Sequence, residues 1–238
     1  MTSLRTRILG GFADPPPEAL ASGRHLRRLL YIVLGIAVAM LAQARKSAPI
    51  QAAPSRLPLY LALIAVEFSL VWFVAIGVHA RGHTLGDLLG RRWRTVSDGL
   101  GDIVVSLGTA GLLRISGPFL YYLLGGWASN TGFLLPATLP ESVVWIAVSA
   151  AAGVSEELVF RGYLQRQIWS LTKNLPVALL LQAFIFSIGH IYQGWKPALV
   201  TAIYGLVFGL VAAWRRSIVP GAIAHWIIDV MGGLMRAG

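Results

Sequence analysis

Four ionisable side chains in the C-terminal half of the chain could carry out acid–base chemistry together: Glu156, His190, His225 and Asp229. Their surroundings in the sequence are strongly apolar, and an ionisable group within a membrane segment is costly enough to be a candidate functional group. A glutamate that is removed from water and lacks a cation becomes a stronger base, which suits it to activate water near neutral pH. These residue types therefore favour hydrolysis by an activated water molecule.

The spacing of Glu156, Glu157 and Arg161 separates two roles. Consecutive residues of an α-helix point about 100° apart, so the two glutamates cannot face the same way. Glu157 and Arg161 are four residues apart, in the favourable order of acid before base. We therefore expect Arg161 to neutralise Glu157 and to leave Glu156 as the base. A charge cluster at the cytoplasmic end of a helix would explain the same residues without any chemistry.

Two further pairs have helical spacing. His190 follows Phe186 by four residues, so the aromatic ring can pack against the imidazole and orient it. His225 and Asp229 are also four residues apart and share one helical face. One histidine in a membrane segment is often a packing residue, but two histidines and two carboxylic acids on three segments favour a common site.

A metal site is the main chemical alternative. Glu156, His190 and His225 could bind zinc as two histidines and one carboxylate. The sequence has no His-Glu-x-x-His motif, and a glutamate that binds metal is lost as a base. We therefore expect no metal and no other cofactor.

Two patterns imitate other proteolytic motifs. Ser155 follows Gly153 as in a serine nucleophile turn, but glutamates come next, and a role as a helix cap is simpler. The segment 99–102 reads Gly-Leu-Gly-Asp, as in aspartyl intramembrane proteases, but it lies beside arginines and lacks the partner Tyr/Phe-Asp motif. Helix capping is the role expected for Asp98 and Asp102.

The composition indicates which elements hold these residues. Of the 238 residues, 56% are hydrophobic and only 13% are charged, about half the usual charged share. Crossing a bilayer takes roughly 20 apolar helical residues. The sequence therefore predicts an all-α, polytopic transmembrane helical bundle with an intramembrane polar cavity. Seven spans are expected: Leu29–Ala44, Leu57–His79, Ile103–Trp127, Ser142–Gln165, Val177–Tyr192, Pro197–Trp214 and Ile218–Met235.

The basic residues predict an orientation. Of 20 lysines and arginines, 13 fall in the tail and loops on the side of the N-terminus, 5 fall on the opposite side, and Arg114 and Arg161 lie within expected spans. Positive charge marks the cytoplasmic side, so we expect the N-terminus inside the cell membrane and the C-terminus outside. The net charge of +10 would indicate nucleic acid in a soluble protein, but beside apolar spans it fits anionic lipid. The expected partners are the bilayer and a peptide or protein substrate, without nucleic acid.

Three finer expectations follow from the spans. Residues 1–24 form a disordered cytoplasmic tail, and residues 25–141 form the N-terminal transmembrane helices. Glu67 and Arg114 lie at similar depth in neighbouring spans and form a structural ion pair, with a break near Pro118. His190 lies about 24 Å and Glu156 about 15 Å from the cytoplasmic side, so a kink, a tilt or a broken span near Gly153 must reconcile them.

Residues 142–235 resemble the CPBP family, which contains the type II CAAX prenyl proteases and the bacteriocin-processing and self-immunity proteins, also called the Abi family. The resemblance rests on E-E-x-x-x-R at Glu156, F-x-x-x-H at Phe186 and H-x-x-x-[N/D] at His225, with the span Gly205-x-x-x-Gly209 before the last motif. It implies an intramembrane endopeptidase with these residues as its catalytic core.

The resemblance also implies the roles of the residues. Glu156 and His190 activate water, while His225 and Asp229 stabilise the oxyanion. The residues Glu157, Arg161 and Phe186 support the site. Position 229 is usually asparagine in the family, so Asp229 is either protonated or holds His225 in the right tautomer. The alternative function is a non-catalytic membrane scaffold or self-immunity protein. A transporter is disfavoured because the sequence has no inverted repeat.

The orientation gives a direct test because the chain contains no cysteine. In a Gly238→Cys variant, a membrane-impermeant thiol reagent should label intact cells. A cysteine placed between Arg81 and Arg94 should be labelled only after the membrane is permeabilised. Labelling of Gly238→Cys only after permeabilisation would show that the number of spans is wrong by one.

Overall fold

The computed structural model describes residues 17–46, 55–126 and 130–235, and this part of the chain is helical without a β-strand. Its elements are α2 (Gly23–Lys46), α3 (Leu57–His79), α4 (Leu85–Leu89), α5 (Val96–Leu123), α6 (Leu139–Glu156), the π-helix η3 (Glu157–Gln165), α7 (Arg166–Thr172), α8 (Leu175–Gly189), the 3-10 turn η4 (Ile191–Gln193), α9 (Trp195–Arg215) and α10 (Val219–Leu234). The expected all-α fold is confirmed.

Five helical segments are long and apolar enough to cross a membrane: α2, α3, α5, the continuous α6–η3–α7 and α9. The helices α8 and α10 are apolar but shorter. These seven segments correspond one by one to the seven expected spans. The chain is therefore a multi-pass membrane protein built as a helical bundle.

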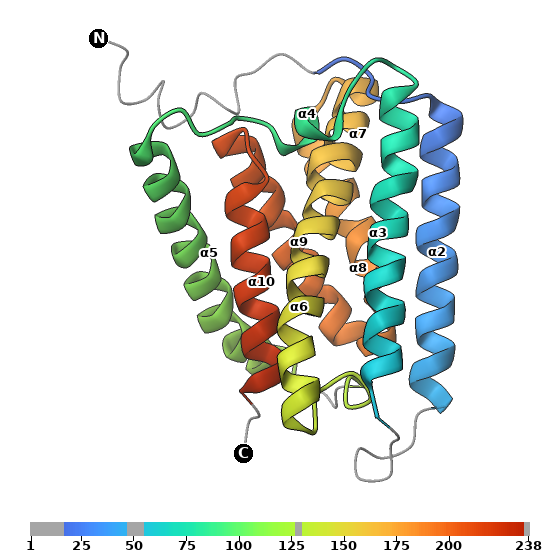
Figure 1. Cartoon of the computed structure of the whole chain (residues 1–238), viewed down its shortest axis with the longest axis vertical. Helices are drawn as coiled ribbons and strands as arrows, with labels where there is room; N and C mark the ends of the chain where they lie inside the picture. Colours follow the sequence, from blue (N-terminus) through green and yellow to red (C-terminus); the bar gives the residue numbers. More distant parts are fainter. Residues whose placement is uncertain (1–16, 47–54, 127–129, 236–238) are drawn as a thin grey trace.

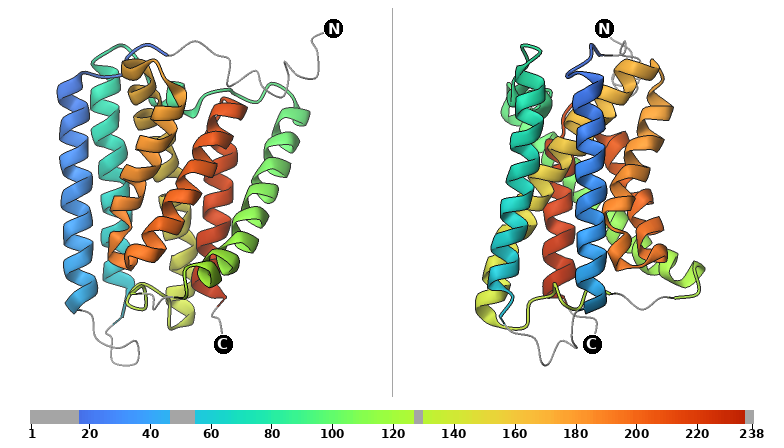
Figure 2. Two further views of the ribbon diagram at one scale, coloured as in Figure 1. Left: turned by 180° about the vertical axis from the view of Figure 1, so that it is seen from behind. Right: turned by 90° about the vertical axis from the view of Figure 1, so that its right-hand side faces the viewer.

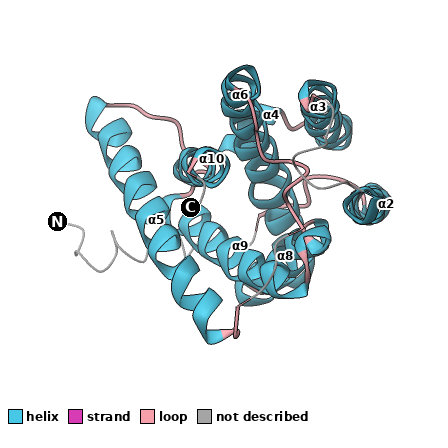
Figure 3. Cartoon of the chain, turned by 90° about the horizontal axis from the view of Figure 1, so that it is seen from below, coloured by secondary structure: helices cyan, strands magenta, loops and turns pink. Residues whose placement is uncertain are grey.

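The helices stand side by side, with α10 and α6 near the middle, α5 on one side and α2 on the far side (Figures 1 and 3). Helix α10 packs against α6 and α5, α3 packs against α6, and α8 packs against α9. Helix α2 begins at one end of the bundle and α10 finishes at the other end (Figure 2). The first and last described segments thus lie on opposite sides of the bundle.

The fourth span is longer than expected. Its extra length removes the expected difference in depth between Glu156 and His190. The helix is continuous from Leu139 to Thr172, instead of ending at Gln165. Glu156 is then about 24 Å from the turn after Thr172, and His190, measured back along α8 to the same turn, is about 22 Å from it. No break occurs at Gly153, where a Cβ would lie 3.0 Å from the Ala222 carbonyl oxygen of α10. This glycine allows a close helix contact.

The predicted pair between Glu67 and Arg114 is wrong. Glu67 lies on α3, which packs against α6, whereas Arg114 is exposed on α5, which packs against α10 and α9. No ion pair joins the two side chains, both of which are described. The predicted break at Pro118 is also absent, because α5 continues to Leu123.

The three residues predicted to cap helices, Asp98, Asp102 and Ser155, differ in outcome. Asp98 forms a capping box with Thr95 at the start of α5, as expected. Asp102, in contrast, is fully buried and accepts hydrogen bonds from Arg215 and from the Trp93 indole, so it ties the ends of α5 and α9 to the loop before α5. Ser155 is not a cap either, because it is buried inside the continuous helix.

A further capping box, at the short helix α4, lies in the loop between α3 and α5. Asp87 accepts hydrogen bonds from the backbone and hydroxyl of Thr84, and these bonds lower the pKa of its carboxyl. The Asp87 carbonyl in turn accepts a hydrogen bond from Arg166 at the start of α7. The loop is thereby fixed to the end of the fourth span.

Most of the expected disordered tail, residues 1–16, lies outside the described residues, as does the expected end of the third span at Trp127. Residues 17–24 differ from the expectation of disorder. Leu20 and Ala21 are buried in the core, and the Ala21 backbone exchanges two hydrogen bonds with the amide of Gln167 on α7. Buried backbone groups need such partners.

Gly205 and Gly209 let α8 and α9 approach closely. A Cβ at Gly209 would lie 2.6 Å from Gln182 Nε2 and 2.8 Å from Gln165 Oε1. Because these glycines have no side chain, their carbonyls remain accessible. The Gln182 amide donates a hydrogen bond to the Gly205 carbonyl, and the Gln165 amide donates one to the Gly209 carbonyl. The glycine pair thus serves both packing and hydrogen bonding.

We predict that Gly209→Ala destabilises the protein by about 1–3 kcal/mol, because overpacking of a filled core costs this much. Gly108→Ala on α5 is the matched control, since nothing lies within 4 Å of its added Cβ and alanine favours a helix. Thermal unfolding in detergent measures both. Equal unfolding temperatures for the two variants would contradict the close approach at Gly209.

Candidate active site

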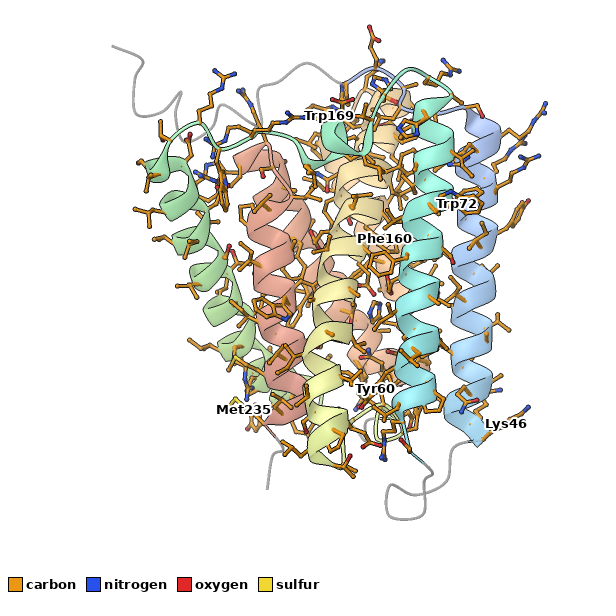
Figure 4. All side chains as sticks on the ribbon, in the orientation of Figure 1. Lys46, Tyr60, Trp72, Phe160, Trp169 and Met235 are labelled. Atoms are coloured by element: carbon orange, nitrogen blue, oxygen red, sulfur yellow. The ribbon has the colours of Figure 1, made fainter. Side chains whose placement is uncertain are left out.

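The four candidate residues come from three different helices and meet in the middle of the bundle. Glu156 is the last residue of α6, His190 immediately follows α8, and His225 and Asp229 lie on α10. Phe160, one turn after Glu156, lies about halfway between Trp169 near one end of the bundle and Tyr60 near the other (Figure 4). The site is therefore deep within the apolar layer.

A buried ion pair forms the base of the site. Arg161 Nη1 lies 2.7 Å from Glu157 Oε1, and both side chains have 0% exposure. Two charges so far from water are stable only as a pair, because a single buried ion carries a large desolvation cost. The sequence-based pairing of Glu157 with Arg161 agrees with this geometry.

Aromatic rings and one carbonyl enclose the guanidinium of Arg161. Its Cζ lies 4.3 Å from the ring centre of Phe186 and 5.3 Å from that of Phe208, and rings attract cations through their faces. Arg161 Nη2 donates a hydrogen bond to the Gly205 carbonyl of α9 at 3.3 Å. The charged η3 helix is thereby attached to α8 and α9.

Glu157 reaches across to α10. Its Oε1 lies 3.4 Å from Nδ1 of His225, and a Cβ at Gly221 would lie 2.7 Å from its Oε2. Glycine at position 221 therefore gives the carboxylate its space. A carboxylate at Nδ1 favours a proton on that nitrogen and fixes the tautomer of the ring. The sequence offered Asp229 as a residue that holds the His225 tautomer; the structure places Glu157 at Nδ1 of the ring and Asp229 at Nε2.

The opposite nitrogen of His225 faces two carboxyls. Nε2 lies 3.6 Å from Glu156 Oε2 and 3.6 Å from Asp229 Oδ2. Phe208 stacks on the ring at 5.2 Å and holds its plane. With carboxyls at both nitrogens, His225 is positioned to carry two N–H groups, because carboxylates only accept hydrogen bonds.

His190 is oriented by Phe186 in two ways. Their ring centres lie 4.6 Å apart, and His190 Nδ1 lies 3.0 Å from the Phe186 carbonyl oxygen. A carbonyl only accepts, so this contact assigns the proton to Nδ1 and leaves the lone pair on Nε2. The expected packing of Phe186 against His190 is thus present, and Nε2 is able to accept a proton from water.

Two adjoining cavities meet at these residues. The larger, about 310 Å³, is lined by Glu156, His190, His225 and Asp229 and lies among α3, α6 and α10. The second, about 220 Å³, lies between α2 and α3 and is mostly apolar. The two cavities share a lining of Met40, Leu63, Glu67, Glu156, His190 and Tyr192. All four candidate residues are therefore brought to one space, large enough for a peptide segment.

Sequence reasoning missed three residues of this space. Glu67 lines both cavities but was assigned to an ion pair, and Tyr192 lines both beside His190, 6.3 Å away between ring centres. Trp145 donates a hydrogen bond to the Asp229 carbonyl and so fixes α10 to α6. The intramembrane acid at position 67 was a usable signal, whereas the two aromatic residues resembled ordinary membrane residues.

The backbone changes from α-helix to π-helix directly after Glu156. Residues Glu157–Gln165 form a π-helix, and every one of them is buried. Segments of this kind are rare and are frequently found at functional sites. Here the segment holds Glu157 and Arg161 directly after Glu156.

The side chains give no evident metal geometry. Within residues 17–46, 55–126 and 130–235, no three His, Asp or Glu side chains are arranged to hold a metal ion. Glu156 Oε2 and His225 Nε2, which belong to two of the residues in the alternative zinc site, lie 3.6 Å apart.

The comparison with protein families decides the relationship. The model of the type II CAAX prenyl endopeptidase Rce1-like family matches residues 137–231. The chain carries an Rce1-like domain. The matched part includes all seven motif residues and confirms the resemblance drawn from them, although it covers less than half of the chain. Rce1-like proteins are proteases, so the domain indicates a protease in general terms. No curated protein and no solved structure matched the chain.

We predict that Arg161→Ala lowers the stability of the Rce1-like domain by about 3–5 kcal/mol, because it leaves Glu157 buried and unpaired. Arg114→Ala is the control, since Arg114 is an exposed arginine of a membrane helix. Unfolding in detergent compares the two variants. Wild-type stability of Arg161→Ala would show that the pair does not support the fold.

Proposed function

We propose that the protein is an intramembrane glutamic-type endopeptidase that hydrolyses a peptide bond of a membrane-associated or CAAX-like substrate. The observation that carries this proposal is the contrast between the two glutamates. Glu157 is paired with Arg161, whereas Glu156 lines both cavities and its buried Oε2 has no hydrogen-bond partner. A carboxylate that is not neutralised by an arginine or a lysine in an apolar site is a suitable general base.

In the proposed reaction, Glu156 takes a proton from a water molecule that also contacts Nε2 of His190. The hydroxide adds to the carbonyl carbon of the scissile peptide bond, and the carbonyl oxygen becomes an oxyanion. Glu156 then gives its proton to the leaving amide nitrogen as the C–N bond breaks. Water is consumed, and a carboxylic acid and an amine are released.

His225 and Asp229 stabilise the oxyanion in this scheme. A protonated His225 presents Nε2–H to the cavity, and preorganised donors of this kind stabilise developing negative charge. Asp229 lies on the same side of the ring, with 33% of its side chain exposed. Because an ionised carboxylate would repel the oxyanion, we propose that Asp229 is protonated during this step.

The second candidate function is a non-catalytic scaffold or self-immunity protein, in which the same cavity binds a peptide without cutting it. The observation that favours it is the presence of a formed polar cavity, which binding alone would also require. Dependence of cleavage on Glu156 discriminates between the two functions.

We predict that Glu156→Gln lowers cleavage about 100-fold or more and leaves thermal stability near wild type, because amide and carboxyl have nearly the same shape. The measurement is mass spectrometry of membrane-spanning and CAAX-type peptides incubated with the protein in liposomes. Glu18→Gln, an exposed residue outside the bundle core, is the control. Activity of Glu156→Gln within about tenfold of wild type would contradict the base role.

Metal dependence provides a separate test of the mechanism. We propose a metal-free reaction, so purified protein should contain no stoichiometric zinc, and chelation should leave cleavage unchanged. A zinc enzyme would lose activity on chelation and regain it when metal returns. About one zinc per chain, lost in both His190→Ala and His225→Ala, would reassign Glu156 from base to ligand.

A further inference from the structure

Glu67 is an acidic residue of the cavity that the proposed mechanism does not use. It lies on α3, outside the matched residues 137–231, and it lines both cavities beside Glu156 and His190. Its carboxyl also interacts electrostatically with His225 and Asp229. A residue of the N-terminal helices therefore contributes directly to the reaction space.

Among the described residues, Glu67 has no hydrogen-bond or ion-pair partner. Its Oε2 is fully buried without a hydrogen bond, and so is Oε2 of Glu156. Neither arginine of the membrane helices pairs with Glu67. Arg161 forms its ion pair with Glu157, and Arg114 lies exposed on α5, which does not pack against α3. An unpaired carboxylate in a membrane interior is costly and calls for a counter-charge.

The cavity linings supply no such counter-charge. Among the residues that the structure describes, they contain three carboxyls, those of Glu67, Glu156 and Asp229, but neither a lysine nor an arginine. His225, the basic group that interacts electrostatically with Glu67, already faces Glu156, Glu157 and Asp229. Without a proton, Glu67 therefore needs a positive charge from whatever occupies the cavities.

We propose that Glu67 is a specificity-determining residue that binds a lysine or arginine side chain of the substrate close to the scissile bond. This inference rests on the proposed function. An extended peptide that passes from the apolar cavity into the polar one meets Glu67 and Glu156 at the shared boundary. A buried pair of opposite charges discriminates strongly, because a neutral side chain would leave the carboxylate unpaired.

The probes are synthetic leucine–alanine membrane-spanning peptides that carry one lysine, or one norleucine as its uncharged counterpart, at successive positions. Their binding to the Glu156→Gln variant in lipid nanodiscs is measured, which does not require cleavage. The same measurement is made on a Glu67→Gln/Glu156→Gln double variant. Glu18→Gln/Glu156→Gln is the control, and Glu67→Asp/Glu156→Gln tests rescue by the conservative change.

We expect the Glu156→Gln protein to prefer lysine over norleucine by tenfold or more in at least one register. The preference should fall to about twofold or less with Glu67→Gln, persist in the control and return in part with Glu67→Asp. No preference, or an equal preference with Glu67→Gln, would overturn the proposal. Cleavage of the same peptides by the wild type reports separately on the protease function. Lysine binding that depends on Glu67 without cleavage would refute that function alone.

Discussion

The buried pair of Glu157 and Arg161 connects the parts of the site, because each of its members contacts other helices. Both side chains have no exposure, and each fulfils the other's need for an opposite charge. Arg161 extends the connection to Phe186 on α8 and to Gly205 on α9, while Glu157 extends it to His225 on α10. In an apolar medium such polar contacts are few and hard to replace, so they fix how these helices are arranged.

The same pair separates the chemical roles of two neighbouring acids. Arg161 neutralises Glu157, which faces His225 Nδ1, while Glu156 lines the cavities without an arginine or lysine partner among the described residues. The difference arises from direction and surroundings, since the residues are of one type and adjacent in the chain.

The N-terminal helices complete a space that the Rce1-like domain only partly encloses. Helix α3 contributes Glu67 and Leu63, and α2 contributes Met40 to the boundary shared by both cavities. Helix α2 packs mainly against α8 and the η4 turn and has little contact with α3, which leaves the apolar cavity between α2 and α3. In the proposed function, the matched domain carries the chemistry and Glu67 on the preceding helix α3 selects the substrate.

The sequence by itself determined the fold class, the seven apolar segments and the pairing of Glu157 with Arg161. These properties follow from hydrophobicity and helical spacing, which act over short stretches of chain. Only the tertiary structure decided the rest. Three features depend on which helices are neighbours, and sequence spacing does not contain that information. They are the end of the fourth span at Thr172, the burial of Asp102 and the position of Glu67 in the cavity. Arg114 and Glu67 lie at similar depth, but depth alone could not reveal that α3 packs against α6 instead of α5.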